Sequence, residues 1–356
     1  MLDAIVVPFI DKEVDLLKSW LRYMPRSGVS AGRLYLSNDG SWLPHVAPML
    51  RDVFSRSELA AEHWTLHFID CAMPASESFY LRGNDSVVDL ARFPYGTKSG
   101  PNQQFFRTMR ALRQLGVAAP CLLLEVDAFP TRPQWLFELD AVIGSADFLI
   151  AGSAYAGQSR LAPQISRHFN GNSVYGLGHR QFDDFLSAWE RLLLHCLKFM
   201  PALAYDIVLE WFRNRSAADL KAAAKAEFAE LMRIYAETAH DLTGCIVNYG
   251  GAHESRAGYT LDVEHFVETW PDAVVVHGKC FIESIYRLRG FYYGKVAPPF
   301  RNPTNLAMAA LQRGDVDQAL LSGHLGSEVC ETLINSPSQL GAAQRHLIGA
   351  QFGVEF

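Results

Sequence analysis

This sequence contains few cysteines, and none of them lies in a motif of closely spaced thiols such as C-x-x-C. The 356 residues contain six cysteines, which are widely scattered and form no C-x-x-C pair. Cys121 and Cys245 lie in apolar runs. Scattered cysteines in apolar surroundings are usually buried free thiols rather than parts of a disulfide framework. We therefore expect free thiols.

An excess of positive charge is also missing. Lysine and arginine number 32 against 38 aspartates and glutamates, which gives a formal net charge of -6. Contact with the phosphates of a nucleic acid duplex requires a basic footprint. Nucleic acid is therefore not an expected partner, although this count leaves room for a local basic patch. Hydrophobic residues at 49% and charged residues at 20% are the proportions of an ordinary globular protein.

Long apolar segments are absent as well. No apolar run approaches the roughly 18 residues that cross a bilayer. The segment 1–10 lacks the basic region and long apolar core of a secretory signal. We therefore expect a cytosolic protein, for which peripheral contact with the inner face of the membrane stays open. A fragment of a longer protein would look the same, and the sequence does not indicate an oligomeric state.

Short apolar runs alternate with helical patterns along the first part of the chain. Apolar, β-branched runs predict strands at 4–10, 33–40, 64–70 and 122–127, and apolar residues at helical spacing predict helices at 11–24, 42–53 and 100–115. This alternation predicts an α/β fold with a mostly parallel sheet, whose ligand sites lie at the carboxyl ends of the strands. The aperiodic segment 72–97 is a long loop. Later segments predict strands at 148–152, 173–175 and 273–277, helices at 181–199 and 206–212, an exposed amphipathic helix at 217–239 and a helical hairpin at 306–321.

Two carboxylates lie at the end of the predicted strand 122–127. Four apolar residues precede Glu125 and Asp127, and Pro130 ends the segment. Alternate residues of a strand share one face, so both carboxylates could reach one side of the sheet end. Hard divalent cations prefer such oxygen ligands. Two solvated acids at a strand end are the competing interpretation.

Four segments in this order resemble a glycosyltransferase of the GT-A type. They are Glu125-Val-Asp127 with Pro130 and Trp135, the loop and strand His168-Phe-Asn-Gly-Asn-Ser-Val-Tyr175, the helix start at Tyr205-Asp206, and Val276-His277-Gly-Lys279. The resemblance covers roughly residues 4–290 and rests on order and spacing. It implies a GT-A-like, Rossmann-type sheet flanked by helices.

The resemblance implies a divalent metal, Mn²⁺ or Mg²⁺, at this sheet edge. Asp127 and His277 would be ligands, because Mn²⁺ also accepts an imidazole, and Glu125 would be a further ligand or a contact to the ribose. A metal that bridges two phosphates neutralises the charge of the leaving group. Lys279 would add a positive charge near the phosphates. A histidine that follows a buried strand could equally be structural.

Other residues are candidates for the donor and acceptor sites. In folds of this type the base lies against the end of the first strand, at Pro8 and Phe9, and Asp39 follows the second strand. The helix start with Lys98, Asn102 and Gln103 could bind an anion. The resemblance places Asn170, Gly171 and Asn172 beside the sugar and acceptor, Asp206 as the acceptor-side base, and Trp211 as an aromatic sugar contact. The alternative, purely structural interpretations are a turn at 170–172, an acid at a helix start at 206 and a capped helix at 100. His168 is expected to be structural.

These expectations predict a metal-dependent transferase that moves a sugar from a nucleotide-diphosphate sugar to a glycan or glycolipid acceptor. The resemblance implies a setting in bacterial surface polysaccharide synthesis. The predicted catalytic domain spans 1–300, with a nucleotide-sugar half at 1–130 and an acceptor half at 131–300, and 301–356 is a helical extension. A nucleotidyltransferase on a similar sheet is an alternative, but the segment Pro8–Glu13 lacks the glycine-rich loop of that class. A non-catalytic carbohydrate-binding protein of the same fold is another.

Overall fold

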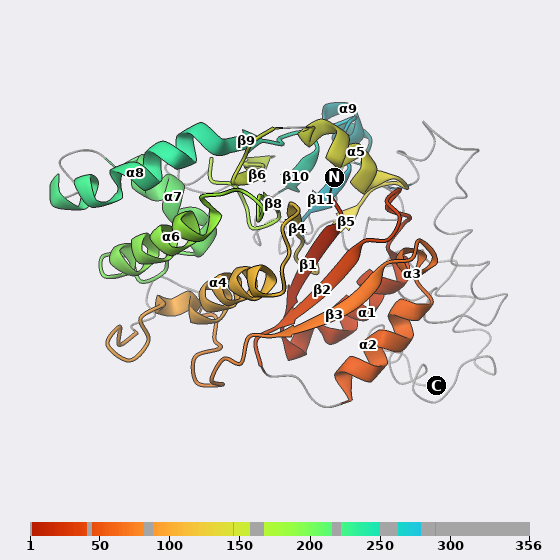
Figure 1. Ribbon diagram of the computed structural model, residues 1–356, viewed down its shortest axis with the longest axis horizontal. Helices are drawn as coiled ribbons and strands as arrows, with labels where there is room; N and C mark the ends of the chain where they lie inside the picture. The colour runs from red at the N-terminus through yellow and green to blue at the C-terminus, as the bar shows by residue number, and fades with distance from the viewer. Residues whose placement is uncertain are drawn as a thin grey trace. The chain divides into compact units, whose positions relative to one another are not determined.

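The computed structural model describes residues 2–40, 45–81, 88–144, 146–156, 167–215, 222–249, 263–278 and 289. The chain divides into two compact units, 1–254 with 272–278, and 255–271 with 279–356. Almost all described elements belong to the first unit (Figure 1). The second contains helix α9 (Val263–Thr269). The predicted boundary at residue 300 and the hairpin at 306–321 lie outside the described residues and stay predictions.

The larger of two sheets has seven strands in the order β3-β2-β1-β4-β8-β6-β9. Strands β1 (Ala4–Phe9), β2 (Arg33–Asn38), β3 (Thr65–Asp70) and β4 (Cys121–Leu123) are parallel to one another. Strand β8 (Val174–Tyr175) is antiparallel to both β4 and β6 (Ile150–Gly152), and β9 (Ala239–Asp241) is parallel to β6. The predicted α/β class with a mostly parallel sheet is confirmed.

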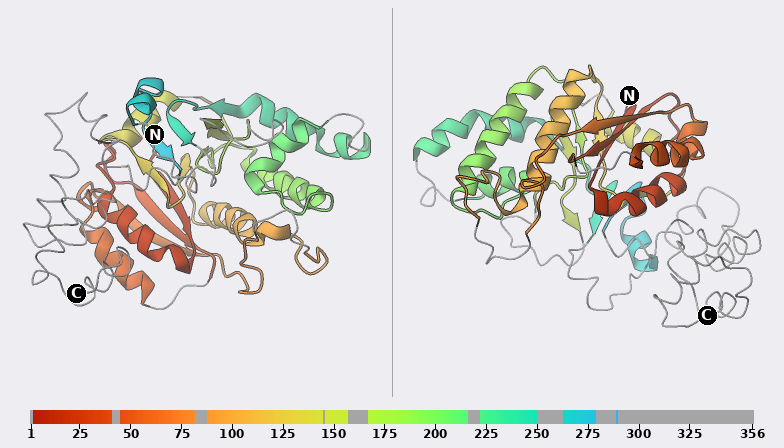
Figure 2. Two further views of the ribbon diagram at one scale, coloured as in Figure 1. Left: turned by 180° about the vertical axis from the view of Figure 1, so that it is seen from behind. Right: turned by 90° about the horizontal axis from the view of Figure 1, so that it is seen from below.

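The helices cover both faces of this sheet. The turn η1 (Asp11–Glu13), α1 (Val14–Tyr23), α2 (Val46–Ser55) and α3 (Glu58–Ala61) lie between the first three strands, and η2 (Gly96–Lys98) leads into α4 (Ser99–Gln114). Figure 2 shows α1 and α2 on one face and α4 on the other. Because crossovers are right-handed, helices change face where the strand order reverses. That reversal lies between β1 and β4.

Strand β1 is apolar throughout because it is covered on both faces, and five of its six residues are buried. The edge strand β3 alternates between exposed and half-buried residues from Thr65 to Phe68, and its Ile69 is buried. The cysteines at 71, 121, 196 and 245 are free, as predicted, and the first three are buried.

A second sheet of four strands has the order β5-β11-β10-β7. It contains β5 (Ala128–Pro130), β7 (Tyr155–Ala156), β10 (Ile246–Tyr249) and β11 (Val275–His277), with β5 antiparallel to β11 and the other pairs parallel. The predicted strand 122–127 is therefore wrong in its extent. Strand β4 ends at Leu123, and the Ala128 N–H donates to the Glu125 carbonyl at 2.9 Å. Glu125 and Asp127 lie in this turn between two sheets, not on one face of a strand.

Helices α5 (Trp135–Ile143), α6 (Phe182–Leu197), α7 (Tyr205–Arg213) and α8 (Ala222–Thr238) complete the first unit. Helix α8, predicted as an exposed amphipathic helix, exposes one face and buries Phe228, Leu231 and Tyr235 on the other. The Phe228 ring contacts Phe212 of α7 edge-on, with centroids 5.7 Å apart. The apolar residues on α8 therefore belong to the core that α6 and α7 form.

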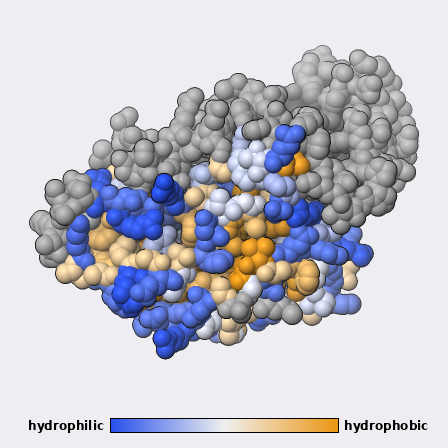
Figure 3. All heavy atoms as spheres, turned by 90° about the horizontal axis from the view of Figure 1, so that it is seen from above, coloured by the Kyte–Doolittle hydropathy of each residue, from blue (hydrophilic) through white to orange (hydrophobic). Residues whose placement is uncertain are grey.

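The outer side of α5 carries apolar side chains. Phe137 is 56% exposed and Val142 is 50% exposed. Helix α5 lies at the top of Figure 1, and apolar side chains gather among hydrophilic ones on that side of the molecule (Figure 3).

Within the described ranges, no helix combines the length and the apolarity that a membrane span needs.

Candidate metal and sugar site

The candidate site lies where the strand order of the large sheet reverses. Asp39 directly follows β2, and the turn with Glu125 and Asp127 follows β4. Because the carboxyl ends of neighbouring parallel strands share one edge, these acids lie along the same edge as the end of β1. Ligands of open α/β sheets bind at such a reversal.

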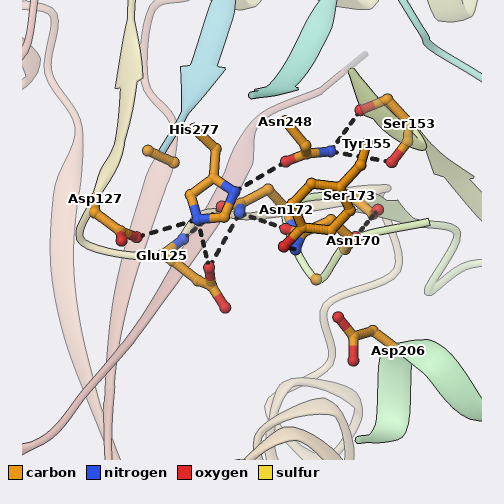
Figure 4. Close-up of polar contacts among 12 residues, drawn as sticks. Glu125, Asp127, Ser153, Tyr155, Asn170, Asn172, Ser173, Asp206, Asn248 and His277 are labelled. Atoms are coloured by element: carbon orange, nitrogen blue, oxygen red, sulfur yellow. Dashed lines mark hydrogen bonds and ion pairs between the residues drawn. The ribbon is translucent and has the colours of Figure 1, made fainter. Parts of the chain in front are cut away.

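Glu125, Asp127 and His277 come together at this edge (Figure 4). The His277 Nε2 atom is 3.0 Å from Glu125 Oε2 and 3.3 Å from Asp127 Oδ1. Strand pairing explains how residues so far apart in sequence meet, because Ala128 of β5 lies opposite His277 of β11. One ligand atom from each residue lies within 4.8 Å of the others. Two carboxylates and an imidazole fit a divalent cation such as Mn²⁺.

Asn248 fixes the orientation of the His277 ring. Its Nδ2 donates to the Ser153 carbonyl at 3.0 Å and contacts Ser153 Oγ at 2.6 Å. A carbonyl only accepts, so the amide oxygen of Asn248 must face His277, where it is 3.1 Å from Nδ1. Nδ1 therefore donates, and Nε2 points to the carboxylates. Sequence reasoning missed Asn248, although a lone polar residue in the run Ile246-Val-Asn-Tyr249 was a usable signal.

Removal of the Asn248 side chain should weaken metal binding. Partners that hold the second nitrogen of a ligating histidine typically contribute 10- to 100-fold in metal affinity, so we expect a loss of about that size in Asn248→Ala. Ser153→Ala is the matched control, because the Ser153 carbonyl keeps Asn248 in place. Calorimetric titration with Mn²⁺ measures both. An Asn248→Ala protein that binds Mn²⁺ like the wild type would contradict this assignment.

The charges around His277 favour a cation at this place. Burial alone lowers the pKa of His277, but Asp127 and Glu125 together raise it to about 10. Without metal, the imidazole therefore carries a second proton, on Nε2, between the carboxylates. Glu13 lies close enough for Asp127, Glu125 and Asp39 to add to the effect of burial in raising its pKa. A negatively charged edge of this kind is stabilised by a bound divalent ion.

Asn170 and Asn172 hold Glu125 in place. Asn172 accepts from the Glu125 backbone N–H at 2.7 Å and donates to Glu125 Oε2 at 3.2 Å. Asn170 Oδ1 accepts from the Asn172 amide nitrogen at 2.6 Å, and its own Nδ2 donates to the Tyr155 hydroxyl. Both asparagines are buried. These bonds give both asparagines a supporting role toward Glu125, and their binding of sugar stays a prediction.

Gly171 lies between these asparagines and faces Tyr205. A Cβ at residue 171 would overlap the Tyr205 hydroxyl, and it would lie 3.3 Å from Tyr205 Cζ and 3.7 Å from Glu125 Oε1. The close approach of Tyr205 is what requires a glycine at residue 171. Its backbone conformation does not, because its φ lies outside the left-handed region. The backbone of residue 171 therefore borders a small region between Glu125 and Tyr205.

Gly171→Ala should destabilise the fold through this overlap, and a second substitution should relieve it. Overpacking of this kind costs about 1–3 kcal/mol in the free energy of unfolding. In Gly171→Ala/Tyr205→Phe the hydroxyl is gone, so most of the lost stability should return. Urea unfolding of both single variants and the double variant measures the coupling. Strictly additive effects would show that the hydroxyl does not lie against residue 171.

Asp206 in the first turn of α7 is paired with His168. His168 Nε2 is 3.6 Å from Asp206 Oδ2, and both residues are largely enclosed. Burial alone raises the pKa of Asp206, but the hydrogen bond and charge of His168 and the charge of Lys98 outweigh it, so the pKa is lowered. Asp206 is therefore a carboxylate at neutral pH. His168, expected to be structural, is the partner that keeps it charged. A lowered pKa favours hydrogen bonds from sugar hydroxyls over strong general-base behaviour.

Asn102 is bonded to three backbone groups, and donor binding by this residue stays a prediction. Its side chain is completely buried, with Nδ2 donating to the carbonyls of Tyr95 and Leu203 and Oδ1 accepting from the Tyr205 N–H at 2.8 Å. Asn102 therefore ties α4 to the start of α7. Gln103 is also buried, and its amide donates to Glu77 and Ser99. Polar residues at this helix start serve the packing of loops.

The remaining donor candidates lie at strand ends or near α7. Pro8 is half-buried, and Phe9 is buried with its carbonyl accepting from Gln104 Nε2 at 3.1 Å. Asp39 is buried and accepts from the Ser78 hydroxyl. Lys98 Nζ lies 5.8 Å from the centroid of the Tyr80 ring. Donor binding by these residues stays a prediction.

Trp211 does not present a free face to a sugar. It is buried, and the guanidinium of Arg215 lies 4.6 Å from the centroid of its ring. Trp211 therefore packs against the protein in this structure, and a sugar contact by Trp211 stays a prediction. Lys279 lies outside the described residues.

No family model and no curated protein matches the sequence. Three solved glycosyltransferases are similar to the chain at low identity. Mouse xyloside xylosyltransferase 1 is 11% identical with a TM-score of 0.43, over 79% of this chain and 98% of that one. The galactosyltransferase LgtC, in complex with donor and acceptor sugar analogues, is 9% identical with a TM-score of 0.39, over 83% and 97%. The bifunctional glycosyltransferase WbbM is 10% identical with a TM-score of 0.43, over 81% and 49%. Likenesses this remote do not assign a function, which we infer from the site.

Proposed function

We propose that this chain is a metal-dependent glycosyltransferase that moves a sugar from a nucleotide-diphosphate sugar to a glycan or glycolipid acceptor. The observation that carries the proposal is the Glu125, Asp127 and His277 group at the strand-order reversal, with the His277 tautomer fixed by Asn248. This edge can hold a divalent cation next to the phosphates of a nucleotide. Mn²⁺ or Mg²⁺ bound there would supply the positive charge that stabilises a departing diphosphate.

The protein groups around this site have separable tasks. Asp127, His277 and Glu125 would hold the metal, and Asn172 fixes the direction of the Glu125 carboxylate. Asp206 would accept hydrogen bonds from hydroxyls of a sugar, since His168 and Lys98 keep it ionised. Groups held in advance lower the barrier because they need no rearrangement during the reaction.

Slow hydrolysis of the donor tests this proposal. The protein is incubated with Mn²⁺ and, separately, with UDP-glucose, UDP-galactose, UDP-N-acetylglucosamine and GDP-mannose, and released nucleoside diphosphate is measured. We expect release from at least one donor and its loss in excess EDTA. Formation of a nucleotide sugar from a sugar phosphate and a nucleoside triphosphate would instead support a nucleotidyltransferase. Binding without either reaction would support a carbohydrate-binding protein.

A further inference from the structure

Tyr205 is the first residue of α7, and the protein holds it on several sides. Its ring stacks on Phe105 with centroids 4.0 Å apart and planes at 9°. Its backbone N–H donates to Asn102, and its carbonyl accepts from Trp189 Nε1 at 2.8 Å. The residue is only 7% exposed. The position of its hydroxyl is therefore fixed by packing of the ring and by hydrogen bonds of the backbone.

The Tyr205 hydroxyl has no hydrogen-bond partner in the part of the chain that the structure describes. Its neighbours differ. The Tyr175 hydroxyl donates to the Gly171 carbonyl at 3.3 Å, and the Tyr155 hydroxyl accepts from Asn170 at 3.1 Å. The Tyr205 oxygen is not among the fully enclosed, unpartnered polar atoms of the described residues, so it remains accessible to a molecule that enters the site. An accessible, unpaired hydroxyl on a fixed ring is available to donate a hydrogen bond to a partner that is not part of the protein.

The surroundings of this hydroxyl indicate where that partner lies. The hydroxyl and Glu125 Oε1 both lie within 4 Å of the place that a Cβ on Gly171 would occupy. Burial raises the pKa of Tyr205 most, and the charges of Asp206 and Glu125 raise it further, so both carboxylates lie near the hydroxyl. The absence of a side chain at residue 171 keeps the approach to it open. A phenol can donate to any oxygen that enters this region.

We propose that the Tyr205 hydroxyl binds the sugar of the donor by donating a hydrogen bond to one of its oxygens. The inference rests on the proposed function, which places the diphosphate at the metal and hence the attached sugar between Glu125 and Asp206. Tyr205 is then a substrate-binding residue that distinguishes a nucleotide sugar from the bare nucleotide.

Tyr205→Phe tests this inference, because it keeps the ring that stacks on Phe105 and removes only the oxygen. With Mn²⁺ present, affinity for the nucleotide sugar that the wild type binds should fall about 2- to 12-fold, the usual effect of one lost neutral hydrogen bond. Affinity for the corresponding nucleoside diphosphate should not change. Tyr95→Phe is the matched control, because that hydroxyl donates to Glu190, away from the site. It should leave both affinities unchanged.

Different failures have different meanings. Equal losses for the nucleotide sugar and the nucleoside diphosphate would overturn the assignment to the sugar, and so would unchanged binding of the nucleotide sugar. Both outcomes would leave the proposed function intact. A wild-type protein that binds none of the four nucleotide sugars named above would overturn the proposed function and this inference together.

Discussion

Asp127→Asn should abolish sugar transfer and leave the fold intact. Asparagine keeps the shape of the side chain but loses the charge that attracts a divalent cation. Stabilisation of a departing diphosphate by a metal supplies several kcal/mol, so the rate should fall by about 10³-fold or more. The melting temperature should stay within a few degrees, because the turn between β4 and β5 is held by the backbone bond from Ala128 to Glu125. Transfer rates measure the loss of activity, and Mn²⁺ titrations measure the loss of metal affinity.

Asp15→Asn is the matched control for that experiment. Asp15 is an exposed acid on α1 that pairs with Lys18. Its variant should keep wild-type transfer and metal affinity. Full activity of Asp127→Asn, or of the wild type in excess EDTA, would remove the metal from the proposed function.

Metal affinity should rise steeply with pH. The pKa of His277 in the metal-free protein is about 10, because Asp127 and Glu125 outweigh the effect of burial. Metal binds the deprotonated Nε2, so at pH values well below 10 each bound ion must release one proton. The apparent association constant for Mn²⁺ should therefore increase by about tenfold per pH unit between pH 6.5 and 8.5. Calorimetry in two buffers of different ionisation enthalpy counts the released proton.

The stability of the metal-free protein should change in the opposite direction. Folding raises the pKa of His277 from an unfolded value of roughly 6.5, so the folded state binds more protons than the unfolded state between these two values. Its contribution to stability is complete below about pH 6.5 and is lost as the pH rises toward 10. His277→Ala should remove both pH dependences. A metal affinity that does not vary with pH would show that His277 is neutral or is not a ligand.

The sequence was sufficient for strands β1 to β3 of the large sheet but not for β9, which was not predicted, or for the turn that carries the acids. Buried parallel strands such as β1 are continuous apolar runs, so their position is visible in the residues alone. The run from Cys121 to Pro130 is also nearly continuous, yet the chain passes from one sheet to another within it. Apolar periodicity does not detect such a change, because both strands are short and both are buried.

The sequence could not show roles that depend on strand register or on which polar groups are hydrogen-bonded in the folded protein. Asn248 meets His277 because β10 and β11 are paired in a register that aligns these two residues. Asn102 is a polar residue at a helix start, a pattern that suits an anion site and a loop anchor equally well. Only the structure shows its three bonds to backbone groups, which make it a loop anchor. Tyr205 attracts attention only once every neighbouring hydroxyl has been given a partner.

The small sheet has a consequence for the order in which the protein acquires activity. Strands β1 to β4 lie within the first 123 residues and can pair while the rest of the chain is still being synthesised. The imidazole of the metal group arrives 150 residues after Asp127, on β11, and its positioning amide arrives on β10. Contacts between residues this far apart in sequence form late in folding, because a long loop must first close at a cost in chain entropy. A nascent or truncated chain would therefore expose a negatively charged turn that binds cations weakly, and tight metal binding would report that β10 and β11 have joined the fold.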